Sequence, residues 1–140
     1  MANDVPAALR IGDQIVRENP RDLASVKLHQ YFAFNRGDAT EMLRIGRTGI
    51  VSIPNFAYHR LRRMLAEEGR APKSGGVLPY EWYNTPNIRF FTIADFEEFC
   101  QRKRIRIHRR IALDTEANTE VFEDANLNAD LAIFCLSRGE

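Results

Sequence analysis

The sequence predicts a three-layer α/β domain with a mixed sheet, and three observations lead to this prediction. The chain has 140 residues, of which 44% are hydrophobic, enough for one buried core. From residue 49 onward, strand-like and helix-like patterns alternate along the chain. The continuous apolar run at residues 131–136, LAIFCL, is typical of a central strand covered on both faces.

The N-terminal segment, residues 1–40, has the weakest pattern, because prolines and glycines interrupt its apolar clusters. A short helix is expected at residues 7–17. Residues 22–34 suit a helix or, in the part 26–34, a strand, and the periodicity does not decide between them. Residues 40–45 then form a helical turn that the following glycine ends.

The next stretch predicts a strand and a helix in succession. Residues 49–53, GIVSI, form a buried strand that Pro54 ends, because proline cannot donate a hydrogen bond to a sheet. Residues 57–68 carry apolar side chains at helical spacing, so they form an amphipathic helix, with Gly69 as its C-terminal stop. A loop rich in glycine follows at residues 70–76.

The aromatic segment, residues 78–87, is predicted to be stiff and irregular, because LPYEWYNTPN holds three aromatic residues and two prolines. Thr92 then caps a helix, with Asp95 favourably placed near its N-terminus. Residues 105–113 alternate apolar and polar side chains, as expected of a half-covered strand.

The last connection, residues 115–128, is acidic and polar, so it should be exposed, with one helical turn around Val121 and Phe122. Cys100 and Cys135 lie among apolar neighbours and outside any Cys-x-x-Cys pattern, so both are predicted to be buried thiols. The three histidines share no ligand spacing, and no metal site is expected.

Charge is balanced overall but uneven along the chain. Residues 1–40 sum to 0, residues 41–110 to +7 and residues 111–140 to −6, which gives the net charge of +1. We expect the two charged blocks to neutralise each other across the surface, so a nucleic-acid partner is not indicated. The apolar runs are too short to span a membrane and no signal peptide is visible, which predicts a soluble cytoplasmic protein.

Three stretches resemble a known family in their sequence, order and spacing. They are EMLRIGRTGIVSIPNF at residues 41–56, LPYEWYNTPNI at residues 78–88 and TIADFEEFC at residues 92–100. Together they closely resemble the MetW family of methionine biosynthesis. The resemblance covers roughly residues 41–113, and residues 131–136 fit the last strand of that family.

The resemblance implies a class I S-adenosylmethionine (SAM) methyltransferase-like, Rossmann-like fold. Residues 49–53 would be its fifth strand, residues 105–113 its sixth and residues 131–136 its seventh, inserted antiparallel between the other two. It also implies SAM as a cofactor and association with homoserine O-acyltransferase, a MetX-like enzyme.

The sequence departs from the family where SAM would bind. Such domains begin with a strand and a Gly-x-Gly-type turn that approaches the cofactor, whereas Gly12 and Gly37 stand alone here. We therefore expect a divergent N-terminal segment at residues 1–40 and the C-terminal half of a MetW-like domain at residues 41–140. This departure argues against SAM binding by this chain alone. A truncated or miscalled gene product is a further reading.

The expected binding residues follow the first predicted strand and fill the aromatic segment: Asn55, Phe56, Tyr80, Trp82, Tyr83, Asn84 and Asn87. Asn55 has two readings, a ligand-binding amide where ligands gather in α/β sheets or an N-cap of the following helix. The aromatic segment is favoured as a binding surface over a loop packed on itself. No spacing identifies a catalytic residue.

Two functions remain from these observations. The favoured one is a noncatalytic partner or activator of homoserine O-acyltransferase, which would bind through the aromatic segment. The alternative is a SAM-dependent methyltransferase acting on a small molecule, in which the protein would mainly position donor and acceptor. Association of the chain with itself stays open.

Overall fold

The computed structural model describes Leu43 and residues 46–87 and 89–139. In chain order, the elements are β1 (Thr48–Pro54), α4 (His59–Arg63), a π-helical turn η1 (Met64–Glu68), α5 (Ile93–Arg102), β2 (Ile105–Asp114), β3 (Thr119–Glu120), α6 (Ala125–Asn128) and β4 (Leu131–Arg138). Apart from Leu43, the elements predicted at residues 7–17, 22–34 and 40–45 lie outside the described residues.

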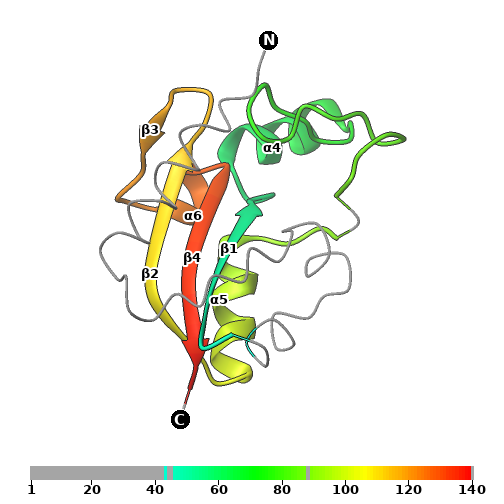
Figure 1. The fold of residues 1–140 in the computed structure, drawn as a ribbon. Helices are drawn as coiled ribbons and strands as arrows, with labels where there is room; N and C mark the ends of the chain where they lie inside the picture. The colour runs from blue at the N-terminus through cyan, green and yellow to red at the C-terminus, as the bar shows by residue number, and fades with distance from the viewer. Residues whose placement is uncertain (1–42, 44–45, 88, 140) are drawn as a thin grey trace.

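The described strands form one antiparallel sheet in the order β1-β4-β2-β3. Strand β4 pairs antiparallel with β1, from Thr48 opposite Ser137 to Pro54 opposite Leu131, and antiparallel with β2 on its other side. Strands β1 and β2 therefore run in the same direction, with β4 reversed between them (Figure 1). The predicted antiparallel insertion of the last strand is confirmed.

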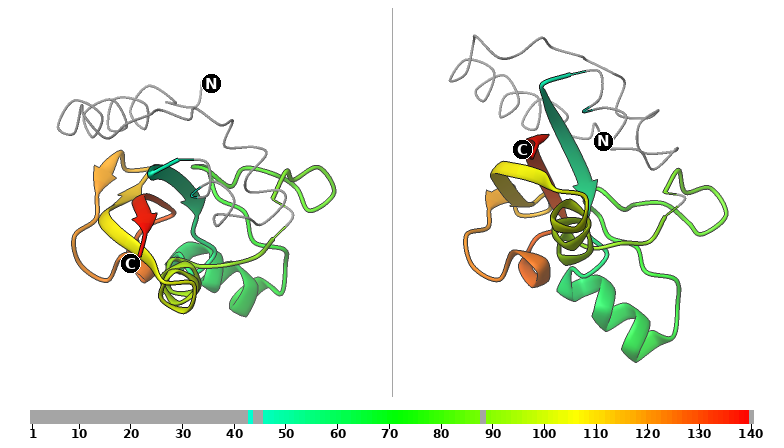
Figure 2. Two further views of the ribbon diagram at one scale, coloured as in Figure 1. Left: turned by 60° about the horizontal axis from the view of Figure 1, so that its bottom comes forward. Right: turned by 90° about the horizontal axis from the view of Figure 1, so that it is seen from below.

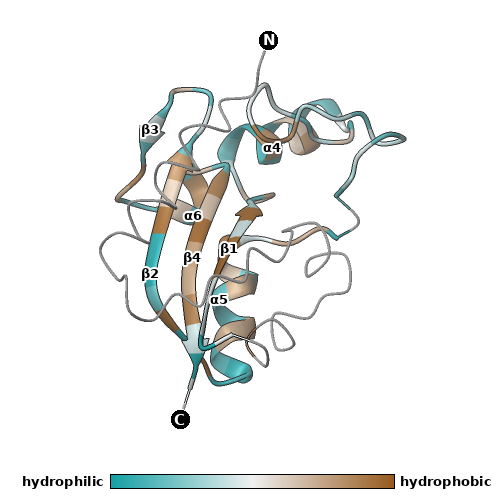
Figure 3. Ribbon diagram, in the orientation of Figure 1, coloured by the Kyte–Doolittle hydropathy of each residue, from teal (hydrophilic) through white to brown (hydrophobic). Residues whose placement is uncertain are grey.

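Helix α5 covers one face of this sheet (Figure 2). Its apolar side buries Ile93, Phe96 and Cys100, and the ring centroid of Phe96 lies 4.8 Å from that of Phe134 on β4. Ile133 is buried on the opposite face, so β4 is buried on both faces, as predicted, and Figure 3 shows its apolar colour along most of its length. Helix α6 packs into the same hydrophobic core as α5. Among the described elements, no helix covers the opposite face of the sheet, so the third layer of the predicted three-layer fold is not among them.

Local sequence explains where the helices begin and end. The Thr92 hydroxyl accepts a hydrogen bond from Asp95 N at 3.1 Å, and the Asp95 carboxylate accepts one from Thr92 N at 2.9 Å, which confirms the predicted cap. Gly69 ends η1 with a left-handed φ of 61°, as predicted. Helix α4 starts at His59 rather than at residue 57, because Tyr58 has a non-helical ψ of 133°.

Two predictions are wrong in detail. The helical turn expected around Val121 and Phe122 lies instead at α6, because Val121 N donates to the Ala112 carbonyl and extends the β2–β3 hairpin. Cys100 is buried as predicted, whereas Cys135 is half-buried. Burial, with the nearby Glu97 charge, raises the pKa of Cys100 to about 11.

None of the described helices is long and apolar enough to cross a membrane.

Candidate functional site

The ends of three strands meet at one end of the sheet. Asn55 directly follows β1, Asp114 is the last residue of β2, and Asp130 directly precedes β4. Because β4 is reversed between β1 and β2, its start lies beside the ends of the other two. This is the edge at which open α/β sheets collect ligands, and it is the first place to look for chemistry.

Asn55 is fully buried, and its amide is saturated by the main chain. Its Oδ1 accepts from Ala57 N at 3.2 Å and from Ile93 N at 3.1 Å. Its Nδ2 donates to the carbonyls of Asn126 at 3.0 Å and of Ala129 at 2.7 Å. An amide has two donors and two acceptor positions, so these four bonds use all of them within the protein. The geometry is that of a structural bridge between β1, α5 and α6.

The reading of Asn55 as the N-cap of the following helix is wrong. Tyr58, not Asn55, is the N-cap residue of α4, and it makes no side-chain capping bond. Asn55 instead supplies an acceptor for Ile93 N, in the first turn of α5. Sequence reasoning placed the amide next to the nearest helix, whereas the fold uses it on one that begins far along the chain.

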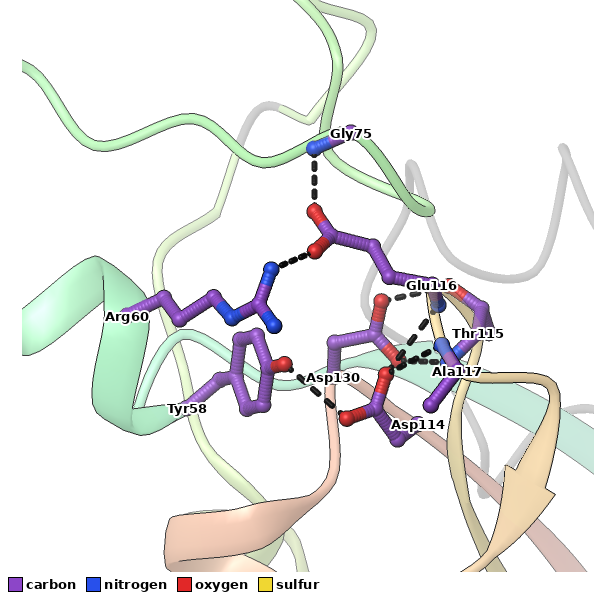
Figure 4. A network of polar contacts seen from close by, with 8 residues as sticks. All are labelled: Tyr58, Arg60, Gly75, Asp114, Thr115, Glu116, Ala117 and Asp130. Carbon is purple, nitrogen blue, oxygen red and sulfur yellow. Dashed lines mark hydrogen bonds and ion pairs between the residues drawn. The ribbon is translucent and has the colours of Figure 1, made fainter.

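Polar side chains surround this edge and form what we call the polar corner: Tyr58, Asp114, Thr115 and Asp130 (Figure 4). The Asp130 carboxylate accepts from Thr115 N at 2.8 Å and from the Thr115 hydroxyl at 2.5 Å. Asp130 is fully buried, and this burial raises the pKa of its carboxyl above the usual range, because its hydrogen bonds offset the desolvation only in part.

Tyr58 and Asp114 complete the polar corner. The Tyr58 hydroxyl donates to Asp114 Oδ2 at 3.1 Å, and burial followed by this contact raises the pKa of Tyr58 to about 12. The other oxygen of Asp114 accepts from Glu116 N at 3.1 Å and from Ala117 N at 3.0 Å. Asp114 therefore closes the turn that leads from β2 to β3. Within the described residues, no three His, Cys, Asp or Glu side chains gather as metal ligands.

A glycine turn, residues 74–78, lies against the polar corner. Gly75 N donates to Glu116 Oε1 at 2.5 Å, and the other carboxylate oxygen of Glu116 pairs with Arg60 (Figure 4). The main-chain N–H of Val77 donates to the Asp130 carboxylate. No local sequence pattern predicts a contact between residues this far apart, and the paired glycines at 75 and 76 predict only a loop.

The aromatic segment lies on the surface beyond this turn. Trp82 is 75% exposed and Tyr83 is 70% exposed, and their rings meet edge to face with centroids 5.6 Å apart. Tyr80 is 38% exposed. The segment has no helix or strand, as predicted, and an ion pair between Lys73 and Glu81 ties it to the preceding loop.

The remaining expected binding residues lie at different depths. Asn84 is exposed and Asn87 half-buried, with Asn87 N bonded to the Thr85 hydroxyl at 3.1 Å. Phe56 is half-buried, and its ring centroid lies 3.8 Å from that of Phe90, a further exposed aromatic residue. The expected residues thus divide into an internal bridge, Asn55, and a surface group around Trp82.

Comparison with known proteins shows which family this chain belongs to. The family model described as methionine biosynthesis protein MetW matches residues 32–136, a stretch that begins within the N-terminal segment and ends in β4. A curated relative from Rhodopirellula baltica, named bifunctional methionine biosynthesis protein MetXA/MetW, is 41% identical over 100 residues. That alignment covers 70% of this chain but 16% of the relative. No solved structure matches the chain. This chain belongs to the MetW family of methionine biosynthesis proteins.

Proposed function

We propose that this chain is a noncatalytic partner of homoserine O-acyltransferase in methionine biosynthesis, and that it binds this enzyme through the aromatic segment. The observation that carries the proposal is the exposure of Trp82 and Tyr83, at 75% and 70%, beside a well-packed core. Large exposed aromatic side chains are costly in water and are typical of protein interfaces. Tryptophan and tyrosine also supply much of the binding energy where proteins meet.

The relative supports the choice of partner. Its name joins MetXA to MetW in one bifunctional protein. Two units fused in one polypeptide are held at a high effective concentration, which favours contact between them. A separate chain of the same family would need a surface to reach its partner, and the aromatic segment offers one.

The polar corner supports a noncatalytic role. The carboxylates of Asp114 and Asp130 accept hydrogen bonds from the main chain, from the Tyr58 hydroxyl and from the Thr115 hydroxyl. The amide of Asn55 is saturated as well. These groups hold the ends of the strands together, and a catalytic site would instead present groups toward a substrate.

The alternative function, a SAM-dependent methyltransferase, is favoured by the sheet order alone, with β4 inserted between β1 and β2. The described residues at the end of β1 do not supply a free amide for a nucleoside, because that of Asn55 is occupied. Calorimetric titration of the full chain with SAM tests this alternative. Tight binding of one SAM per chain would favour the methyltransferase over the partner.

Binding of the full chain to purified homoserine O-acyltransferase, measured by biolayer interferometry, tests the proposal. Trp82→Ala should weaken binding by about thirtyfold, the effect of losing an interface hot spot. Phe122→Ala is the matched control, because Phe122 is an aromatic residue of similar exposure, 80%. It belongs to the segment between β3 and α6, which lies at the left in Figure 1, whereas the aromatic segment lies at the right. Equal affinities of the wild type and the Trp82 variant would reject the aromatic segment as the contact.

A further inference from the structure

The aromatic segment begins from a fixed base. Ser74 N donates to the Leu78 carbonyl at 2.8 Å, which closes the glycine turn on itself. Leu78 is 3% exposed and packs in a small apolar cluster with Tyr58 and Leu61. The exposed ring of Tyr80 follows two residues later, so the orientation of the aromatic segment depends on how this turn is seated.

The glycine turn rests on three residues that are distant from it in sequence, and we call them the seat: Thr115, Glu116 and Asp130. The main chain of the turn donates two hydrogen bonds to it, from Gly75 N to Glu116 (Figure 4) and from Val77 N to Asp130. Thr115 joins the seat through its hydroxyl and main-chain bonds to Asp130, at 2.5 Å and 2.8 Å. Because both groups of Thr115 are engaged and Asp130 is fully buried, neither side chain can move aside freely.

Gly76 lies at the point of closest approach between the turn and the seat. A Cβ atom at this position would lie less than 3.0 Å from both Thr115 Oγ1 and Asp130 Oδ2, a separation that real Cβ atoms essentially never show. At Gly75, the nearest atom to an added Cβ is Glu116 Oε1, at 3.1 Å, the far end of a flexible side chain that can shift by a few tenths of an ångström. Gly76 is therefore required for close contact with the seat, and Gly75 much less so.

We propose that Gly76 is a positioning residue for acyltransferase binding: by letting the glycine turn rest on Thr115 and Asp130, it fixes the orientation in which the partner meets Trp82. This inference rests on the proposed function. A surface held in its binding conformation loses less conformational entropy on association, so seating the turn raises affinity without adding a contact. Gly76 itself touches no partner.

The experiment compares Gly76→Ala with Gly75→Ala in the full chain. Both changes restrict the unfolded chain to the same degree, so a difference between them reports on the folded state. Trp82 is the one tryptophan in the sequence, and its fluorescence anisotropy reports directly on the motion of the aromatic segment. Gly76→Ala should lower this anisotropy and weaken acyltransferase binding by about tenfold, as expected when a tenth of the molecules are binding-competent. Gly75→Ala should resemble the wild type in both measurements.

Glu116→Ala is a second variant, for the case in which Gly76→Ala does not fold. It removes the acceptor of Gly75 N from an exposed position, and it should lower the Trp82 anisotropy and the affinity in the same direction but by less. Unchanged anisotropy in folded Gly76→Ala and Glu116→Ala would overturn the proposal, whether or not their affinity falls. The anisotropy is measured without a partner, so failure of the seat is distinguishable from failure of the proposed function, which Trp82→Ala tests separately.

Discussion

The polar corner and the aromatic segment reverse the usual distribution of side chains. At the polar corner, Asp130 is fully buried, as is neighbouring Asn55, whereas Trp82 and Tyr83 of the aromatic segment are exposed. The buried polar groups are hydrogen-bonded, which makes their burial tolerable, and the exposed rings have no comparable compensation. The contrast separates two roles: the polar corner maintains the fold, and the aromatic segment is available for binding.

The largest expected effect on stability comes from Asn55→Ala. This change leaves the N–H groups of Ala57 and Ile93 and the carbonyl of Ala129 unpaired in the interior, so it should lower the free energy of unfolding by about 4 kcal/mol. Urea denaturation followed by circular dichroism measures the change. The control is Asn84→Ala, which removes an exposed amide and should shift stability by less than about 0.5 kcal/mol. Similar losses of stability in the two variants would mean that the buried amide of Asn55 contributes no more to the fold than the exposed amide of Asn84.

Tyr58→Phe should have a smaller effect, about 1 kcal/mol, because it removes one hydrogen bond to Asp114 and leaves the ring packed. The folded pKa of about 12 lies above the ordinary tyrosine value of 10.0, so the folded state keeps the Tyr58 proton to a higher pH than the unfolded state does. The stability of the wild type should therefore fall as the pH rises from 10.0 toward 12, and this loss should be reduced in the variant. An ultraviolet tyrosinate titration in which the variant keeps the component near pH 12 would contradict the assignment.

Asp130 should make the stability of the fold depend on pH in the opposite direction to most paired carboxylates, whose contribution to stability is lost in acid. Because its folded pKa is raised above the ordinary value of 3.8, the folded state binds its proton more tightly than the unfolded state. Its contribution to the free energy of unfolding should increase as the pH falls through the raised pKa and level off below 3.8. Urea denaturation across this range should show the wild type gaining stability relative to Asp130→Asn. If the wild type instead lost stability relative to Asp130→Asn, the hydrogen bonds that lower the pKa of Asp130 would outweigh the burial that raises it.

The smallest expected effect on folding comes from Trp82→Ala in the free chain. The side chain is 75% exposed and contacts the Tyr83 ring, so its removal should change the free energy of unfolding by less than about 0.5 kcal/mol. The same variant is expected to lose acyltransferase binding. Thermal unfolding of the variant checks this separation, and a large drop in its midpoint would place Trp82 with the structural residues.

Sequence reasoning succeeded where the determinant is local. The helix cap at Thr92 depends on Asp95 three residues later, and the stop at Gly69 depends on one left-handed residue. The doubly buried strand β4 could be read from its unbroken apolar run. Each of these elements is specified by residues within one short window.

Contacts between distant residues could not be read in the same way. Asn55 bonds to carbonyls 71 and 74 residues away, and Thr115 meets Asp130 only because β2 and β4 are neighbours in the sheet. The same limit explains the misplaced helical turn of α6, since the pairing of β3 with β2 decides where the hairpin ends. The aromatic segment was identifiable because its composition is unusual in itself, whereas the seat beneath it was not.

The place of β4 in the sheet has a consequence for the order of folding during synthesis. Strand β4 lies between β1 and β2 but follows both in the chain, so neither can pair across the middle of the sheet until β4 has been synthesised. Until then, the nascent chain holds two strands without their shared neighbour, and their apolar side chains are exposed in a state prone to aggregation. The sheet is therefore expected to close only after β4 has been synthesised, and ribosome-bound chains that lack β4 should be recognised by chaperones.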